Sequence, residues 1–133
     1  MPYQVTFDKL FPYDPGEAGI TLQVKLNPQD QFPAIPAKVD TGASYCIFAR
    51  RYGERLGLDI ETGLRQVFGT ATGTFVAYGY EVSLTVGELE FDTLAFFPAD
   101  EEITRNVLGR FGWLDRVVLG LVDYEGKLYL SRY

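Results

Sequence analysis

The amino-acid sequence predicts an all-β protein with one or two short helices. Apolar and polar residues alternate along much of the chain, glycine-containing turns separate the alternating segments, and 9 Tyr and 10 Phe are present. Alternation with a period of two places every second side chain on one face of a strand, and aromatic side chains pack well on a pleated sheet. The 133 residues are enough for one compact core. We therefore expect residues 1–133 to form a single domain.

Strand-like alternation appears in three parts of the chain. The first is residues 20–26, where the apolar positions are Ile20, Leu22, Val24 and Leu26. The second runs from Val82 to Phe91 and is interrupted by Gly87-Glu88, which predicts a two-residue hairpin with glycine first. The third consists of residues 117–122 and 127–132, which we expect to pair through a turn at residues 123–126.

Helical patterning is scarce. Apolar and basic residues recur at helical spacing only in residues 48–58, which predicts one short amphipathic helix. A second helical turn is expected near residues 111–115. Loops are predicted at residues 12–19 and 27–36, because both stretches are rich in residues that favour turns.

The composition excludes several classes of function. The formal net charge of -6, from 12 basic and 18 acidic residues, does not supply the basic surface that nucleic acids or anionic membranes need. The chain has no histidine, which excludes Ser-His-Asp triads, Cys-His pairs and histidine-ligated metal sites. No apolar run approaches the ~18 residues of a membrane-spanning helix. We expect no nucleic-acid partner, no membrane partner, no metal and no cofactor.

The single cysteine indicates the cellular compartment. Cys46 cannot form an internal disulfide, and the first residues lack the pattern of a secretion signal, so we expect a cytoplasmic protein. Without a histidine to activate its thiol, Cys46 is expected to be a small core residue. The acidic run at residues 100–102 could attract calcium, but such a run is usually a solvated loop.

The stretch most informative about chemistry is residues 39–44, Val-Asp-Thr-Gly-Ala-Ser. An acidic residue ends an apolar strand there and is followed by a hydroxyl residue and a glycine. This order predicts a buried carboxylate that the loop's own N–H groups satisfy. The alternative is an ordinary type I turn, which is common for an isolated Asp-Thr-Gly. A second element, Asn-Val-Leu-Gly-Arg at residues 106–110, lies far downstream and is followed by Trp113-Leu114 and an apolar strand.

The two elements in this order, with a glycine-containing hairpin between them, resemble the retropepsin-like aspartic proteases over about residues 20–131. The resemblance implies a closed β-barrel of the acid-protease (retropepsin) type and an aspartic-type peptidase. It makes Asp40 the catalytic carboxylate, with Thr41 bracing the active-site loop and Gly42 offering backbone to substrate. Residues 107–109 would pass behind that loop. Residues 118–120 fit the same apolar-apolar-Gly pattern, but residues 110–114 match the family's continuation after the earlier copy.

The family carries a mobile hairpin, the flap, at the place of residues 69–75. Small residues and two glycines suit a mobile tip, although an ordinary exposed hairpin is an equal alternative from these residues alone. The residues that the resemblance places against a substrate are Ala43, Gly69, Thr70, Ala71, Thr72, Gly73, Thr74 and Leu108. A peptide would bind there as an added strand.

One carboxyl group is too few for the reaction. Water attack on a peptide bond by this route needs one carboxylate as base and one carboxylic acid as proton donor. The chain has a single Asp-Thr-Gly, and Asp92-Thr93-Leu94 lacks the glycine, so we interpret that second site as surface. We therefore expect a homodimer in which two copies of Asp40 meet on a two-fold axis, with a peptide or protein as substrate. Residues 127–133 are a candidate interface segment.

Three questions stay open from the sequence. Ser44 stands where retroviral members often have a carboxylate that pairs with the arginine of Leu-Gly-Arg, so Arg110 needs another partner. Lys38 either lines the floor of the site, favouring acidic substrate side chains, or points to solvent. Two rival functions are a dimeric β-barrel of the same fold that binds peptide or protein without cutting it, and a structural interaction domain in which Asp40 is only a turn residue.

Overall fold

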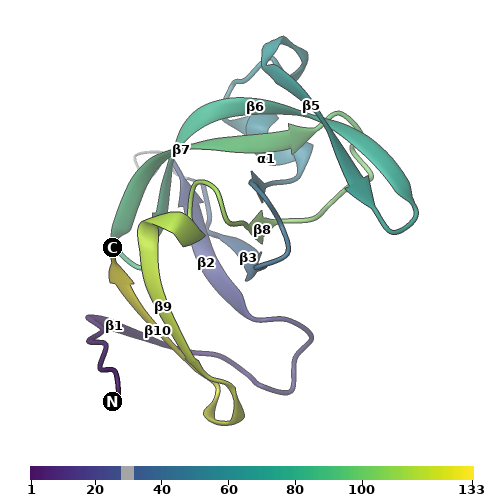
Figure 1. The fold of residues 1–133 in the computed structure, drawn as a ribbon. Helices are drawn as coiled ribbons and strands as arrows, with labels where there is room; N and C mark the ends of the chain where they lie inside the picture. The colour runs from purple at the N-terminus through teal and green to yellow at the C-terminus, as the bar shows by residue number, and fades with distance from the viewer. Residues whose placement is uncertain (28–31) are drawn as a thin grey trace.

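The structure of the chain, a computed structural model, describes residues 1–27 and 32–133. Within these residues the elements are β1 (Lys9–Pro12), β2 (Thr21–Leu26), β3 (Ile35–Val39), β4 (Cys46–Ile47), α1 (Arg50–Arg55), η1 (Ile60–Thr62), β5 (Leu64–Thr70), β6 (Gly73–Val86), β7 (Leu89–Pro98), β8 (Val107–Leu108), η2 (Leu114–Arg116), β9 (Val117–Val122), η3 (Asp123–Glu125) and β10 (Lys127–Arg132). Strands dominate and the helices are short (Figure 1), which confirms the predicted fold class.

A closed barrel forms the body of the molecule. Its strands are hydrogen-bonded in the order β2-β3-β8-β4-β7-β6, and β6 returns to pair with β2. The ring therefore has no free edge except where β5 is added to β6 as the outer strand of a long hairpin. Two of the pairings, β3 with β8 and β4 with β7, are parallel and bring together segments far apart in sequence.

A separate three-stranded sheet has the order β1-β10-β9 and holds both ends of the chain (Figure 1). Its β9–β10 hairpin was predicted from the sequence and is confirmed, with residues 123–126 as the turn. β10 is the middle strand, so its backbone is already paired on both sides. Residues 127–130 can therefore take part in a subunit contact only through side chains, whereas Ser131 and Arg132 have a paired strand on the β9 side alone.

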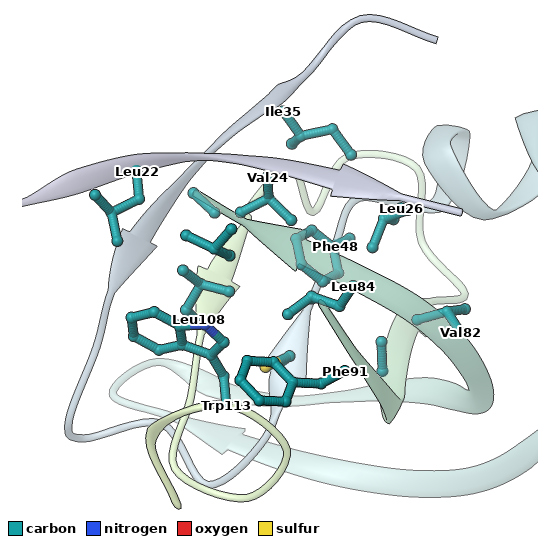
Figure 2. Close-up of a cluster of buried hydrophobic side chains, with 14 of the residues drawn as sticks. Leu22, Val24, Leu26, Ile35, Phe48, Val82, Leu84, Phe91, Leu108 and Trp113 are labelled. Carbon is teal, nitrogen blue, oxygen red and sulfur yellow. The ribbon is translucent and has the colours of Figure 1, made fainter. Parts of the chain in front are cut away.

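The alternating apolar residues converge in one main core (Figure 2). Along β2 the buried positions are Leu22, Val24 and Leu26, as predicted, while Ile20 is only partly covered. The fully buried indole of Trp113 closes this core from the turn that follows β8. Each fully buried side chain of this size stabilises the fold by roughly 1.5–3 kcal/mol. The core is therefore the main source of stability for the strands that carry the Asp40 loop.

The predicted helix at residues 48–58 is shorter than expected. α1 covers only Arg50–Arg55, because the Phe48 backbone N–H donates to the Phe96 carbonyl oxygen (3.0 Å) and extends the β4–β7 pairing. The second helical turn is η2, which begins at Leu114 rather than near residue 111. Tertiary hydrogen bonding has overridden the local helical spacing in the first case.

Both predicted loops need correction, whereas the predicted two-residue turn at Gly87-Glu88 is confirmed. The loop at 12–19 begins one residue later, because Pro12 is the last residue of β1. The stretch at 27–36 is shorter at its C-terminal end, since Ile35 and Pro36 already belong to β3; its residues 28–31 lie outside the described part of the chain. The two-residue β6–β7 turn is present, but both Gly87 (φ 52°) and Glu88 (φ 72°) have positive φ. Positive φ at both positions defines a type I′ turn. Among the described residues, no helix is long and apolar enough to cross a bilayer.

Cys46 is fully buried in the main core, as predicted. Burial raises the pKa of its thiol from 9.0 to about 11, because the thiolate cannot be solvated there. We expect Ellman's reagent to label the native protein at about pH 8 no faster than the protein unfolds. Above about pH 9 the unfolded state loses the thiol proton first, so stability should fall as the pH rises toward about 11. Fast labelling of the native protein would contradict this burial.

Candidate active site

Asp40 follows the last residue of β3, where that strand leaves the barrel. β3 runs parallel to β8, with Val39 opposite Leu108, and the Asp40 backbone N–H donates to the Leu108 carbonyl oxygen (3.0 Å). Lys38 is held in the same way by the carbonyl oxygen of Asn106 (2.9 Å). The main chain on both sides of the aspartate is therefore fixed by the downstream segment.

The rest of the loop is interlocked with the residues after β8. The Arg110 N–H donates to the Ala43 carbonyl oxygen (2.9 Å), and the Phe111 N–H donates to the Ser44 carbonyl oxygen (2.8 Å). Gly109 lies against the next residue of the loop so closely that a Cβ atom there would be 2.3 Å from the Tyr45 carbonyl oxygen. Residues 107–109 thus pass behind the loop, whereas the similar residues 118–120 lie in β9, in the other sheet.

The Asp40 carboxylate is less buried than the sequence predicts. Its side chain is 34% exposed in the single chain. One oxygen, Oδ1, accepts the backbone N–H of Gly42 (2.9 Å), and the other, Oδ2, lies 3.5 Å from Nη2 of Arg105. In one chain alone, the prediction of a buried carboxylate satisfied by the loop is therefore wrong. The side chain is only partly covered, and the loop donates a single N–H to it, that of Gly42.

A hollow of about 290 Å³ lies between the Asp40 loop and the β5–β6 hairpin. The loop contributes residues 40 and 42–45, and the hairpin contributes residues 66–69 and Phe75. The aromatic rings on its walls are packed together: Phe68 stacks on Phe75 (centroids 5.3 Å apart) and meets Tyr45 edge-on (6.1 Å). The hollow therefore combines one carboxylate, Asp40, and one guanidinium, Arg105, with aromatic side chains, which suits an amphipathic ligand such as a peptide.

The predicted flap is the end of the β5–β6 hairpin, which extends beyond the barrel (Figure 1). Thr70 pairs with Gly73, so residues 71–72 form the turn, and residues 69–74 are all exposed. The pairing of β6 with β7 starts only at Ala77, so these outer residues have no third strand beside them. Gly69 lines the hollow beside Asp40, whereas Thr70, Thr72, Gly73 and Thr74 line a separate hollow with residues 102–105.

The other residues that the sequence singled out differ in how they are placed relative to Asp40. Thr41 is exposed, and its hydroxyl makes no hydrogen bond within the described chain. Leu108 is fully buried in the core and reaches the site only through its carbonyl oxygen. Arg110 is exposed with its guanidinium 5.6 Å from the Phe111 ring, and it forms no ion pair with the described residues. Lys38 is exposed as well, yet it borders a second hollow beside Asp40.

Sequence reasoning missed Arg105. It is 65 positions from Asp40 in the chain. The available signal is its place directly before Asn106-Val107-Leu108: a cation at the start of the segment that passes behind the loop must lie near the carboxylate. The Asp-Thr-Leu at residues 92–94, which we interpreted as surface, is only partly so: Asp92 is exposed but Thr93 is buried.

No group of three potential metal ligands converges in residues 1–27 and 32–133. In the acidic run, the Asp100 carboxylate accepts the backbone N–H of Glu102 (2.9 Å), which is an ordinary turn interaction.

A closed β-barrel with one Asp-Thr-Gly loop at its opening, a segment locked behind that loop and a hairpin over it defines a protein of the acid-protease type. A family model described as aspartyl protease matches residues 22–113, and the chain therefore belongs to the aspartyl protease family. Members of this family hydrolyse peptide bonds. This assignment confirms the family resemblance seen in the sequence.

Two solved structures illustrate the shared fold. A retropepsin-like aspartic protease from Rickettsia conorii has a TM-score of 0.69 and 20% sequence identity, covering 96% of this chain and 100% of that one. EIAV protease in complex with the inhibitor HBY-793 has a TM-score of 0.55 and 19% identity, covering 71% of this chain and 85% of that one. At these identities the likeness supports the retropepsin-like barrel. A search of curated proteins finds no match.

Proposed function

We propose that this chain is an endopeptidase in which two copies of Asp40, one from each subunit of a homodimer, form the catalytic pair. The observation that carries the proposal is the Asp40 loop itself. Backbone hydrogen bonds from both sides hold it, and its carboxylate faces a hollow under the β5–β6 hairpin. A carboxylate fixed in this way beside a peptide-sized hollow has the position that a general base needs.

The proposed reaction uses one water molecule. One Asp40 carboxylate would take a proton from the water as it attacks the peptide carbonyl carbon, and the protonated Asp40 of the other subunit would give a proton to the carbonyl oxygen. In the breakdown of the tetrahedral intermediate, the first Asp40 would pass the water-derived proton to the nitrogen as the C–N bond breaks. The other Asp40 would take a proton back from a hydroxyl of the intermediate, so that the pair again holds one proton. The cycle therefore starts with one proton held between the two carboxyl groups, because it needs one base and one acid.

The dimer is supported by the incomplete surroundings of Asp40 in one chain. The carboxylate is about one third exposed, and Thr41 and Gly42 are exposed beside it, so the loop presents an open side to a second copy. Contact between two such loops would exclude water from the reacting groups. It would also supply the second carboxyl group that the chemistry requires.

Subunit mixing tests the shared centre. Wild-type and Asp40→Asn chains are mixed in equal amounts, unfolded and refolded together, and assayed at fixed total concentration. If every centre needs Asp40 from both subunits, the rate should be about one quarter of the wild-type rate, because only that share of dimers has two intact aspartates. Independent subunits would retain about one half, and that result would contradict the shared centre.

The finer expectations accompany this proposal. Residues 1–133 are proposed to act as one domain on peptide or protein substrates. A cytoplasmic location is proposed on the basis of the single, buried cysteine. A binding module of the same fold would show no hydrolysis in the mixing experiment at any ratio of the two chains.

A further inference from the structure

Arg105 lies at the meeting point of the hollows around Asp40. It borders the hollow under the hairpin, a second of about 550 Å³ beside β3, and a third of about 480 Å³ below the hairpin tip. Its side chain is 50% exposed, so the guanidinium is accessible from the cleft. Asp40 lines the first two of these hollows, so a ligand that contacts Asp40 from either of them would meet this cation.

Lys38 adds a second positive charge to the same side of Asp40. Along β3 the side chains alternate, so Ile35 and Ala37 enter the core while Lys38 and Asp40 share the other face. Positions two apart on a strand are roughly 7 Å apart. The stem of Lys38 lies against Gly19, where a Cβ atom would be 3.0 Å from the Lys38 Cδ. That packing limits the directions in which the ammonium group can point.

The charges in the hollow beside β3 do not cancel. Its lining contains two cations, Lys38 and Arg105, and one anion, Asp40. The nearest further acid on the described lining of these hollows is Glu102, which borders the one below the hairpin tip. A local excess of positive charge is unusual on a chain with a formal net charge of -6. Such a site attracts anionic groups from a surface that otherwise repels them.

The Arg105–Asp40 contact is weak enough to be exchanged. Nη2 and Oδ2 are 3.5 Å apart, and both side chains are substantially exposed. Ion pairs of this kind contribute at most about 1 kcal/mol. A guanidinium offers five N–H donors in a planar fork, so Arg105 can bind a second carboxylate in the bidentate geometry while it remains near Asp40.

We propose that the hollow between β3 and residues 104–107 binds an acidic substrate side chain, Asp or Glu, next to the bond that is cut. Arg105 is the direct partner of the substrate carboxylate, and Lys38 provides the second positive charge. The proposal rests on the proposed peptidase function for the cut bond, but the acidic preference concerns binding and is measurable without cleavage. Arg105 is a specificity-determining residue, and its removal leaves the Asp40 pair in place.

The test compares peptides that differ only in charge. Pools of octapeptides with Glu, Gln or Lys fixed at each position in turn, and the other positions randomised, are incubated with immobilised Asp40→Asn protein. Bound peptides are quantified by mass spectrometry, and the same pools are digested with wild-type protein. At one position we expect Glu to be retained about tenfold better than Gln, and this ratio to fall at high salt. Wild-type kcat/KM should show the same preference through KM.

Three variants assign the effect. Arg105→Gln should reduce the Glu-to-Gln ratio to about one, and Arg105→Glu should shift the preference to Lys, since it reverses the charge at the same place. Arg51→Gln is the matched control, because it removes an equal charge from an exposed site on α1 and should leave the ratio unchanged. Arg105 is half exposed, so these changes should not unfold the protein.

The outcomes separate this inference from the proposed function. Selection of acidic peptides without Asp40-dependent cleavage would support the site and contradict the peptidase. Cleavage that depends on Asp40 but shows equal use of Glu and Gln at every position would overturn the acidic site alone. If the immobilised protein retains no Glu peptide better than its Gln partner, the acidic site is also overturned. If Arg105→Glu keeps the preference for Glu, Arg105 is not the residue that binds the acidic side chain.

Discussion

Asp40→Asn is expected to abolish peptide hydrolysis, lowering kcat/KM by about a thousandfold or more. Asparagine has nearly the same shape as aspartate but can neither accept the proton from water nor return it, and general acid–base catalysis contributes roughly 10²–10⁴ in rate. The measurement is the cleavage of a diverse peptide pool, followed by mass spectrometry at several pH values. Because Asp40 is about one third exposed, the substitution should leave the fold intact.

Asp92→Asn is the matched control for that experiment. Asp92 belongs to an Asp-Thr-Leu sequence, is exposed on β7, and makes no contact with the hollows around Asp40. The same change of charge there should leave the rate within about twofold of wild type. Hydrolysis that survives Asp40→Asn would exclude this carboxylate from the chemistry.

Gly109→Ala is expected to cause the largest loss of stability among the substitutions near the site. The new methyl group would lie 2.3 Å from the Tyr45 carbonyl oxygen and 2.5 Å from its carbonyl carbon. These are backbone atoms of the interlocked loop, so no side-chain rotation can relieve the clash. We expect a decrease in unfolding free energy of about 3 kcal/mol, the upper end of the usual overpacking range. Calorimetry should show a melting temperature lower by about 10 °C.

Hydrolysis by the Gly109→Ala protein shows whether the clash also displaces the active-site loop. At a temperature where the variant is still folded, the displaced Tyr45 would move the Asp40 loop, and hydrolysis should be lost as well. Gly69→Ala is the control, because a Cβ at that exposed glycine would meet no atom within 4 Å. Its unfolding free energy should stay within about 1 kcal/mol of wild type. Equal stability of the two alanine variants would refute the close packing described here.

Local patterns predicted most of the strands in this chain. β2 and the β6–β7 and β9–β10 hairpins follow from alternation and from turns that glycine permits, because both signals act over a few residues. The position of Asp40 at the end of a strand, and of residues 107–109 behind it, followed from the paired motifs. The strands and turns depend on chemistry that is visible within ten residues, whereas the placement of residues 107–109 was implied by the family resemblance.

Contacts between distant segments account for what the sequence did not reveal. Phe48 fits the helical spacing, but its backbone N–H donates to the Phe96 carbonyl oxygen of β7 instead. Asp40 was expected to be buried, but burial depends on what covers the loop, and within one chain little does. Arg105 meets Asp40 only because β3 and β8 are parallel neighbours, and no local pattern encodes that pairing.

The shape of the β5–β6 hairpin has a consequence for which proteins could be attacked. Phe68 packs against Tyr45 and Phe96, which leaves residues 69–74 as the unanchored tip of the hairpin. This tip, with its turn, extends about 10 Å beyond Phe68. A hairpin tip this short can cover a single extended segment of substrate but cannot close over a folded loop or helix. Target proteins would therefore have to unravel locally before they are cut. The ease with which each target opens would then limit cutting in addition to the acidic preference proposed above.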